Sequence, residues 1–310
     1  MTRHDLPQLQ GELYITDGGM ETTLIFHHGV DLPHFASFDL LKDEAGRQLL
    51  RDYYASYVDL ARELEVGLLL DTPTWRANRD WGAKLGYSEE ELEQVNRDGV
   101  RLVEDLRTDE GPPIVVSGCI GPRGDGYQAS SRMTSDEATE YHTPQAETLA
   151  SSGADMLSAL TMTYAEEPIG VVHAAAATGL PVSISFTVET DGRLPSGQSL
   201  RDAIEHVDAE TDGTTAYFMI NCAHPTHFAD AIEAGEPWVD RIGGLRANAS
   251  AKSHAELDES TELDDGDPAE LGDLYAALRP SLPRVTVVGG CCGTDHRHVG
   301  AMCRGWTAAS

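Results

Sequence analysis

The chain has 310 residues, of which 40% are hydrophobic, so it can bury a large core as one barrel or as two ordinary domains. Its 52 acidic residues outnumber its 22 basic residues, and the formal net charge of −30 argues against nucleic acids and anionic membranes as partners. No apolar run reaches the roughly eighteen residues of a membrane-spanning helix, and the first residues lack the apolar stretch of a secretory signal. The odd number of cysteines, five, fits a reducing compartment, so we expect a cytoplasmic protein.

The acidic excess extends along the whole chain rather than forming a tail, and only three lysines oppose it: Lys42, Lys84 and Lys252. Such a surface repels itself in dilute buffer, whereas at 1 M salt the Debye length falls to about 3 Å and the repulsion is screened. We therefore hypothesise that the protein is halophilic. The charge carries no information about its chemistry.

Eight short apolar runs recur along the chain, with helix-like segments between them: residues 13–16, 66–70, 114–117, 154–160, 182–186, 216–220, 242–245 and 285–288. The runs are continuous rather than alternating, which is typical of parallel strands buried on both faces. Residues 47–64 repeat apolar side chains at three- and four-residue steps and predict a helix. Further helices are predicted to begin at Ser88 and Ser199, which resemble capping boxes, and at Asp267-Pro268.

Eight strand–helix units predict an α/β fold, namely a single-domain (β/α)8 TIM barrel that spans residues 1–310. An open doubly wound sheet is the alternative. Neither a Gly-x-Gly-x-x-Gly motif after the first strand nor a Walker loop is present, so nucleotide binding has no support. The acidic segment 252–268 is predicted to be a solvent-exposed loop.

In a barrel of this type, the active site lies at the C-terminal ends of the strands. Polar residues or cysteines end almost every predicted strand: Asp17-Gly18-Gly19, Asp71-Thr72, Ser117-Gly118-Cys119, Thr161-Met162-Thr163, Thr187, Asn221-Cys222, Asn248 and Gly289-Gly290-Cys291-Cys292. Strand eight neighbours strand one in a closed barrel, so Asp17 is expected close to the last two cysteines.

Cys222, Cys291 and Cys292 match the three protein ligands of a catalytic zinc site, which leaves one coordination position open. Adjacent strand residues point to opposite faces, so the backbone must leave strand geometry at the Cys291-Cys292 pair, and the flanking glycines permit this. Buried inert thiols or a redox pair are the alternatives, and inert burial is what we expect of Cys119 and Cys303. His224 and His227 are expected to line the following loop rather than to bind the metal.

These motifs resemble the homocysteine S-methyltransferase family, which includes betaine–homocysteine methyltransferase, the S-methylmethionine-dependent enzymes and the homocysteine module of cobalamin-dependent methionine synthase. The matching motifs span nearly the whole chain in the same order: Asp17-Gly18-Gly19, Asn221-Cys222 and Gly289-Gly290-Cys291-Cys292-Gly293-Thr294.

The resemblance implies a barrel in which Cys222, Cys291 and Cys292 bind Zn²⁺. It also implies that Asp17, with the turn at Gly18-Gly19, helps to hold the substrate's amino group, and that Asn221 supports the site.

One departure from the family concerns the end of the fourth strand. Family members commonly carry a glutamate there that binds the homocysteine amine, whereas Thr161 stands near that place in this chain. Glu21 or Glu189 could replace the missing carboxylate. Otherwise the acceptor is a thiol other than homocysteine.

We therefore predict a zinc-dependent methyltransferase of methionine biosynthesis that moves a methyl group from a small sulfonium or ammonium donor to a thiol, with homocysteine as the expected acceptor. No catalytic side chain is predicted beyond the zinc ligands. A homocysteine-binding module served by a separate corrinoid or folate donor, and a zinc- and thiol-binding barrel without transfer activity, remain alternatives. The sequence leaves the donor and the oligomeric state open, and its aromatic candidates for donor binding are Trp75, Trp81, Tyr164 and Phe186.

Overall fold

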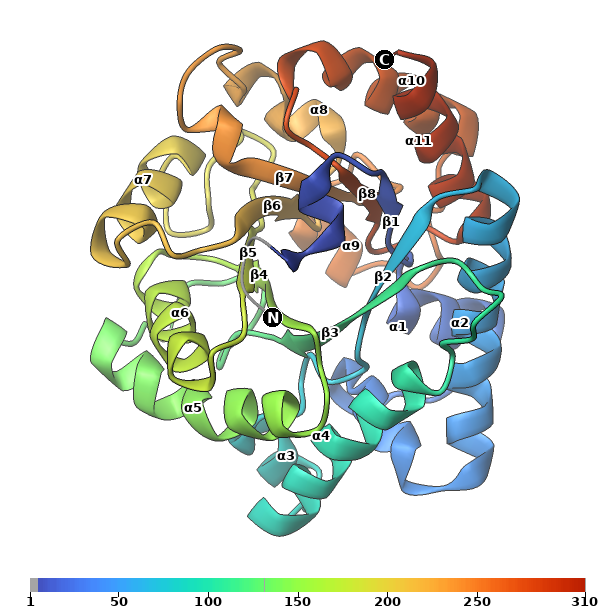
Figure 1. The fold of residues 1–310 in the computed structure, drawn as a ribbon, viewed down its shortest axis with the longest axis vertical. Coiled ribbons are helices and arrows are strands. Elements are labelled where there is room, and N and C mark those ends of the chain that lie inside the picture. Colours follow the sequence, from blue (N-terminus) through green and yellow to red (C-terminus); the bar gives the residue numbers. More distant parts are fainter. Residues whose placement is uncertain (1–4, 131, 310) are drawn as a thin grey trace.

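The computed structural model describes residues 5–130 and 132–309, and its strands form a closed, all-parallel barrel (Figure 1). In chain order the strands are β1 (Tyr14–Ile15), β2 (Gly67–Asp71), β3 (Ile114–Ile120), β4 (Met156–Met162), β5 (Val182–Phe186), β6 (Tyr217–Asn221), β7 (Ile242–Ala247) and β8 (Val287–Gly290). Each strand pairs with its sequence neighbours, and β8 closes the barrel against β1 with Val287 opposite Tyr14. The predicted (β/α)8 barrel is confirmed, and the open doubly wound sheet is excluded.

Helices surround the barrel and cover the outer faces of its strands (Figure 1). They are α1 (Met20–Thr22), α2 (Glu44–Leu64), α3 (Arg79–Lys84), α4 (Glu89–Glu104), α5 (Ser135–Ser151), α6 (Glu166–Thr178), α7 (Leu200–Glu210), α8 (Pro225–Phe228), α9 (His254–Asp258), α10 (Pro268–Leu278) and α11 (His296–Ala308). In the part of the chain that the structure describes, none of these helices is both long enough and apolar enough to cross a membrane.

Side-chain caps fix the starts of several helices where the sequence predicts them. Ser88 and Glu91 form a complete capping box at α4, and Ser199 caps α7 by accepting a hydrogen bond from the backbone N–H of Asp202. Asp267 caps α10, whose first residue is a proline. Helix α2 begins three residues before the predicted position, because Asp43 accepts a hydrogen bond from the backbone N–H of Gly46.

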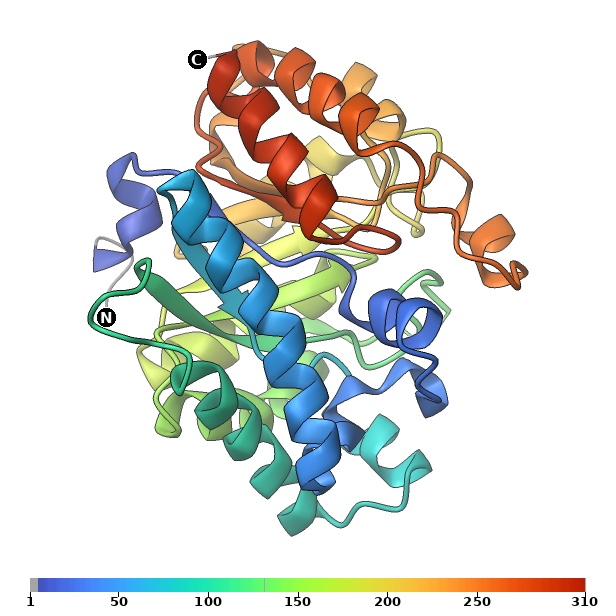
Figure 2. The ribbon, with the colours of Figure 1, turned by 90° about the vertical axis from the view of Figure 1, so that its right-hand side faces the viewer.

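Apolar side chains fill both the inside and the outside of the barrel. One cluster, which includes Leu69, Met156, Met219 and Val287, fills the interior. It also contains Leu6, next to the 3₁₀ turn Pro7–Gln10, which lies at one end of the barrel while α9 lies at the other (Figure 2). Burial on both faces explains why the strand runs are continuously apolar.

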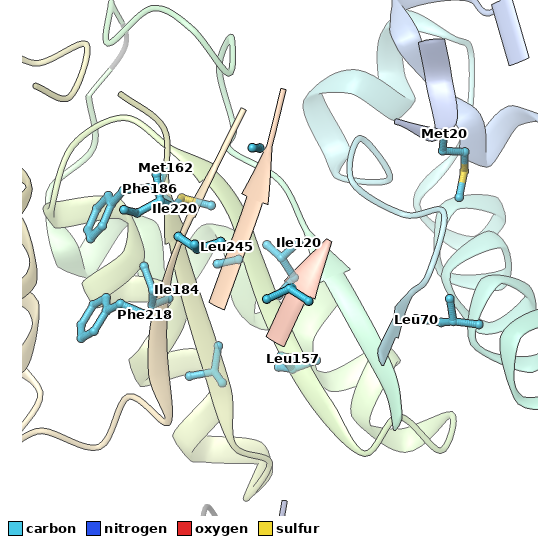
Figure 3. Packing of buried hydrophobic residues seen from close by; sticks show 14 of the residues in the cluster. Met20, Leu70, Ile120, Leu157, Met162, Ile184, Phe186, Phe218, Ile220 and Leu245 are labelled. Carbon is cyan, nitrogen blue, oxygen red and sulfur yellow. The ribbon is translucent and has the colours of Figure 1, made fainter. Parts of the chain in front are cut away.

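A second apolar cluster lies between the strands and the surrounding helices. Figure 3 shows Phe186 and Ile184 of β5 beside Phe218 and Ile220 of β6 within this layer, and every residue of these two strands is buried. The two layers make a rigid support for the strand ends. The acidic segment 252–268 is mostly exposed as predicted, but it contains the short helix α9 and the buried His254, so it is more than a solvated loop.

Candidate active site

Three cysteine sulfurs meet at the C-terminal ends of two strands that are distant in the sequence. Cys222 directly follows β6, and Cys291 and Cys292 directly follow β8. The Sγ atom of Cys222 lies 2.7 Å from that of Cys291 and 3.7 Å from that of Cys292. Within the described residues, these three form the one group of cysteine, histidine or acidic side chains arranged to hold a metal ion.

The backbone leaves strand geometry at each cysteine, as the adjacent pair requires. Strand β8 ends at Gly290, and Cys291 donates its N–H to the carbonyl of Ala247 at 2.7 Å. Cys222 adopts a φ of +52°, in the left-handed region that non-glycine residues rarely enter. A Cβ on Gly290 would lie 2.0 Å from the Thr294 hydroxyl, so only glycine fits there. Gly293, directly after the pair, has a φ of +79°, so the prediction that a flanking glycine permits this turn is confirmed for Gly293.

The pKa values of the three thiols are shifted in opposite directions. Hydrogen bonds from Cys222 and Cys292 lower the pKa of Cys291 well below its ordinary value, although burial opposes this, and the guanidinium of Arg246 lowers it further. Hydrogen bonding to Cys291 raises the pKa of Cys222, and hydrogen bonding to both partners raises the pKa of Cys292. These directions favour Cys291 as the first of the three sulfurs to lose its proton, and a metal would displace the protons of the other two.

The donor set fits zinc. Soft thiolates favour this ion, and its bonds to sulfur of about 2.3 Å place two sulfurs of a tetrahedral site about 3.8 Å apart. The Cys222–Cys292 separation of 3.7 Å agrees with this spacing, and the Cys222–Cys291 separation of 2.7 Å is shorter. The cluster could therefore hold a metal after a small movement of one sulfur.

A buried arginine joins three strand ends beside the thiols. Arg246 of β7 is 5% exposed, and its guanidinium forms ion pairs with the carboxylates of Asp17 and Asp71. Its Nε donates to the carbonyl of Gly290 at 3.2 Å, and the hydroxyl of Tyr53 lies 3.1 Å from Oδ2 of Asp17. Burial raises the pKa of Asp17 to about 7, although Arg246 opposes this. Asp17 thus reaches the site as predicted, with its carboxylate already held by the protein, and its contact with a substrate ammonium stays a prediction.

The thiols open onto a pocket of about 80 Å³. Its wall includes every residue that the sequence predicts for the site: Asp17, Gly18, Gly19, Thr161, Asn221, Cys222, Cys291 and Cys292. At Gly19 a Cβ would lie 2.6 Å from the carbonyl oxygen of Cys291, so this turn packs directly against the cysteine pair.

Thr161 and Asn221 hold each other in this wall. The N–H of Thr161 donates to Oδ1 of Asn221 at 3.0 Å, and Nδ2 of Asn221 donates to the Thr161 hydroxyl at 2.9 Å. Thr161 has a φ of +63°, at an irregularity in the pairing of β4 with β5, so its side chain is re-aimed there. The same Nδ2 lies 3.9 Å from Sγ of Cys291, which places Asn221 in support of the cluster.

Glu21 is one of the two carboxylates expected to replace the missing glutamate. It lines the thiol pocket, and its Oε1 accepts a hydrogen bond from the Ser37 hydroxyl at 2.8 Å. Burial raises the pKa of Glu21. Glu189, the other carboxylate considered, lies 3.5 Å from Nδ1 of His254 and is not part of the pocket wall.

The histidines after Cys222 contribute to local structure instead of joining the thiol group. His224 caps α8 by accepting the N–H of Thr226, and Nε2 of His227 lies 2.9 Å from the carbonyl of Ala251. Cys119 and Cys303 are each 2% exposed, which confirms their burial, and Cys119 also lies in the wall of the thiol pocket.

Of the four aromatic candidates for donor binding, one lines the thiol pocket and the other three do not. Trp75 lines the thiol pocket. Trp81 packs beneath the guanidinium of Arg76, with 3.7 Å between the ring centroid and Cζ. Tyr164 and Phe186 are buried in packing: the hydroxyl of Tyr164 accepts the N–H of Met133, and Phe186 lies parallel to Phe218.

A second, larger cavity of about 410 Å³ adjoins the thiol pocket. The two share the wall residues Thr22, Phe35, Trp75, Tyr127 and Cys292. The two cavities are therefore adjacent, with Cys292 among the residues that they share.

Sequence reasoning missed three polar residues of this region. Tyr127 places its hydroxyl 3.5 Å from Sγ of Cys222 and 3.7 Å from Sγ of Cys292, and Arg76 lines the larger cavity. Arg246 could have been suspected, because it directly follows the predicted run 242–245, and a charged residue that extends a buried strand demands buried partners. Tyr127 and Arg76 lie in loops whose path the sequence does not reveal.

The chain is similar to known homocysteine methyltransferases in sequence and in fold. A model of the homocysteine S-methyltransferase family matches residues 14–305. The homocysteine S-methyltransferase YbgG of Bacillus subtilis (strain 168) is 24% identical over 314 residues, which cover 93% of this chain and 92% of that protein. The crystal structure of the Escherichia coli homocysteine methyltransferase MmuM in its oxidised form matches with a TM-score of 0.73 at 21% identity over 99% of both chains. Its metallated form matches with a TM-score of 0.72 at 19% identity over 96% of both chains. These structural likenesses support the barrel fold, and the family match shows that the chain belongs to the homocysteine S-methyltransferase family.

Proposed function

We propose that this S-methyltransferase binds zinc through Cys222, Cys291 and Cys292 and transfers a methyl group from a small sulfonium or quaternary ammonium donor to homocysteine, giving methionine. The observation that carries the proposal is the meeting of three thiols at the ends of β6 and β8, on the wall of a pocket that leaves room for a fourth sulfur. When bound, zinc would act as a Lewis acid that keeps the acceptor thiol deprotonated and nucleophilic at neutral pH.

The protein's own side chains would bind and position the acceptor. Glu21 offers a carboxylate to the ammonium of the acceptor in the thiol pocket, in place of the glutamate that Thr161 replaces. Asn221 fixes the wall through its bonds to Thr161, and Arg246 holds Asp17 and Asp71 in place. This preorganisation positions the acceptor sulfur and limits access of water to it.

The transfer is a direct displacement between the two cavities. The acceptor sulfur gives its electron pair to the donor's methyl carbon, and the bond from that carbon to the sulfonium or ammonium centre breaks. The donor leaves as a neutral sulfide or amine. The larger cavity beside Tyr127 and Cys292 supports a small-molecule donor over a corrinoid or folate.

The test begins with the metal. Wild-type protein should contain about one zinc per chain, Cys291→Ser should lose it, and Cys303→Ser, at a buried thiol away from the site, should keep it. Zinc-loaded protein should form methionine from homocysteine with S-methylmethionine or betaine, measured by mass spectrometry. Full-rate methylation by folded, metal-free protein would refute the zinc assignment. Tight homocysteine binding without turnover with any methyl donor would instead favour a thiol-binding barrel.

A further inference from the structure

Arg76, in the loop after β2, is a buried arginine with unpaired donors among the described residues. It is 8% exposed, and neither its Nε nor its Nη1 has a hydrogen-bond partner in the described part of the chain. Its guanidinium stacks on two indole rings, with Cζ 4.6 Å from the ring centroid of Trp75 and 3.7 Å from that of Trp81. The rings hold the flat group in one orientation and leave the hydrogen-bonding capacity of its edge unused.

A buried charge that lacks a counter-ion is costly, so this arrangement needs a reason. Burial lowers the pKa of Arg76, while the nearby carboxylates of Asp125, Glu21 and Asp258 act in the opposite direction. No ion pair to Arg76 is present among the described residues, whereas the equally buried Arg246 has two. An incoming anion would satisfy the guanidinium, and a carboxylate matches its two parallel donors.

The cavity that Arg76 lines has the composition expected for a zwitterion. Arg76 is its one lysine or arginine within the described residues, whereas four acidic residues line it: Asp125, Asp258, Glu262 and Asp264. Burial and the charge of Asp125 raise the pKa of Asp258, so a cation would relieve this pair. Aromatic rings of Trp75 and Tyr127 stand at the wall shared with the thiol pocket, where an onium group could contact their faces.

We infer that Arg76 is a specificity-determining residue that binds the carboxylate of the methyl donor, with the donor's onium end at the wall shared with the thiols. This inference rests on the proposed methyl transfer. Because Arg76 lines the larger cavity and not the thiol pocket, it acts on the donor rather than on the acceptor. Donors that carry a carboxylate are therefore preferred to onium compounds without one.

The experiment compares donors in matched pairs: glycine betaine with choline, and S-methylmethionine with its decarboxylated analogue 3-(dimethylsulfonio)propylamine. For the donor that wild type uses, Arg76→Gln should raise the KM by about 10- to 100-fold, as expected for loss of a charge-assisted contact, and Arg76→Lys should recover part of it. The KM for homocysteine and the zinc content should stay within about twofold of wild type. Arg79→Gln is the matched control, since Arg79 is exposed and lies outside both pockets.

Two readouts separate this inference from the methyl-transfer proposal. Equal donor KM in wild type and Arg76→Gln, or a raised homocysteine KM alone, would overturn the role of Arg76 while leaving methyl transfer intact. If no donor turns over, calorimetric titration with glycine betaine and S-methylmethionine still tests the site, and binding lost in Arg76→Gln supports it. Should the variant fold poorly, wild type alone decides, because choline and betaine of equal efficiency would refute carboxylate recognition.

Discussion

Asn221 at the end of β6 and Thr161 at the end of β4 form two hydrogen bonds with each other. The side-chain oxygen of Asn221 accepts from the backbone N–H of Thr161, and its side-chain nitrogen donates to the Thr161 hydroxyl. Both residues lie in the wall of the thiol pocket. The pair also holds Thr161 at a positive φ, a conformation that a β-branched residue avoids without such support.

Thr161→Val should therefore destabilise the protein by about 1–3 kcal/mol, because the buried amide of Asn221 loses its acceptor. The neighbouring Sγ of Cys291, 3.9 Å from that amide, should become less well positioned, so kcat should fall as well. Urea unfolding and steady-state kinetics measure the two effects. Thr161→Ser keeps the hydroxyl and should behave like wild type, and a Thr161→Val protein of unchanged stability would contradict the assigned role.

Arg246 should be the most sensitive residue of the site for stability. Its removal in Arg246→Met leaves Asp17 and Asp71 buried without a cation, which should cost about 3–5 kcal/mol in the free energy of unfolding. The exposed pair Arg201–Glu205 is the control, and Arg201→Met should change stability by no more than about 1 kcal/mol. Similar losses of unfolding free energy in both variants, measured by urea unfolding, would show that the buried network contributes no more to stability than an exposed ion pair.

The apolar runs predicted the barrel, and the strand-end motifs together with the family resemblance named the eight residues that line the thiol pocket. Continuous apolar strands follow from burial on both faces, and a closed parallel barrel brings the ends of β6, β8 and β1 together whatever the loops do. Cys222, Cys291, Cys292 and Asp17 lie one or two residues after these strands, so the fold brings them close together.

Residues on the loops could not be placed in this way. Tyr127 and Arg76 reach the site through connections whose course depends on tertiary packing, such as the stacking of Arg76 on Trp81. The pairing of Arg246 with Asp17 could not be predicted either. Arg246 lies beyond the predicted run 242–245, and the structure shows that β7 extends to Ala247 with Arg246 opposite Gly289 of β8. Choosing Glu21 over Glu189 likewise required the pocket itself.

The cysteines should differ strongly in reactivity toward alkylating reagents. Burial raises the pKa of Cys303 to about 11 and that of Cys119 well above its ordinary value, whereas hydrogen bonds from its neighbours lower the pKa of Cys291. In metal-free native protein, iodoacetamide should therefore modify Cys291 first. Cys119 and Cys303 should react only after unfolding in guanidinium.

The pH dependence of the alkylation rate tests the lowered pKa of Cys291 more directly than the order of labelling does. An ordinary thiol, with a pKa near 8.5, loses about a hundredfold in thiolate when the pH falls from 8 to 6. Because the pKa of Cys291 is lowered, its alkylation should slow much less over this range, and added zinc should protect it. Peptide mass spectrometry identifies the modified residue. A hundredfold decrease at Cys291, or equal labelling of Cys303, would be incompatible with the assigned protonation of the cluster.

The surface charge should make folding depend on salt. The net charge is −30, and acidic residues such as Glu89, Glu90 and Glu91 at the start of α4 stand close together on the exposed surface. Raising the salt from 0.1 M to 1 M shortens the Debye length from about 10 Å to about 3 Å, which screens this repulsion. Salt also weakens the surface ion pairs, but these contribute little to stability, so the loss is small. The melting temperature should therefore rise with KCl. Sorbitol at matched osmolality is the uncharged control, and a melting temperature highest in dilute buffer would contradict an adaptation to high salt.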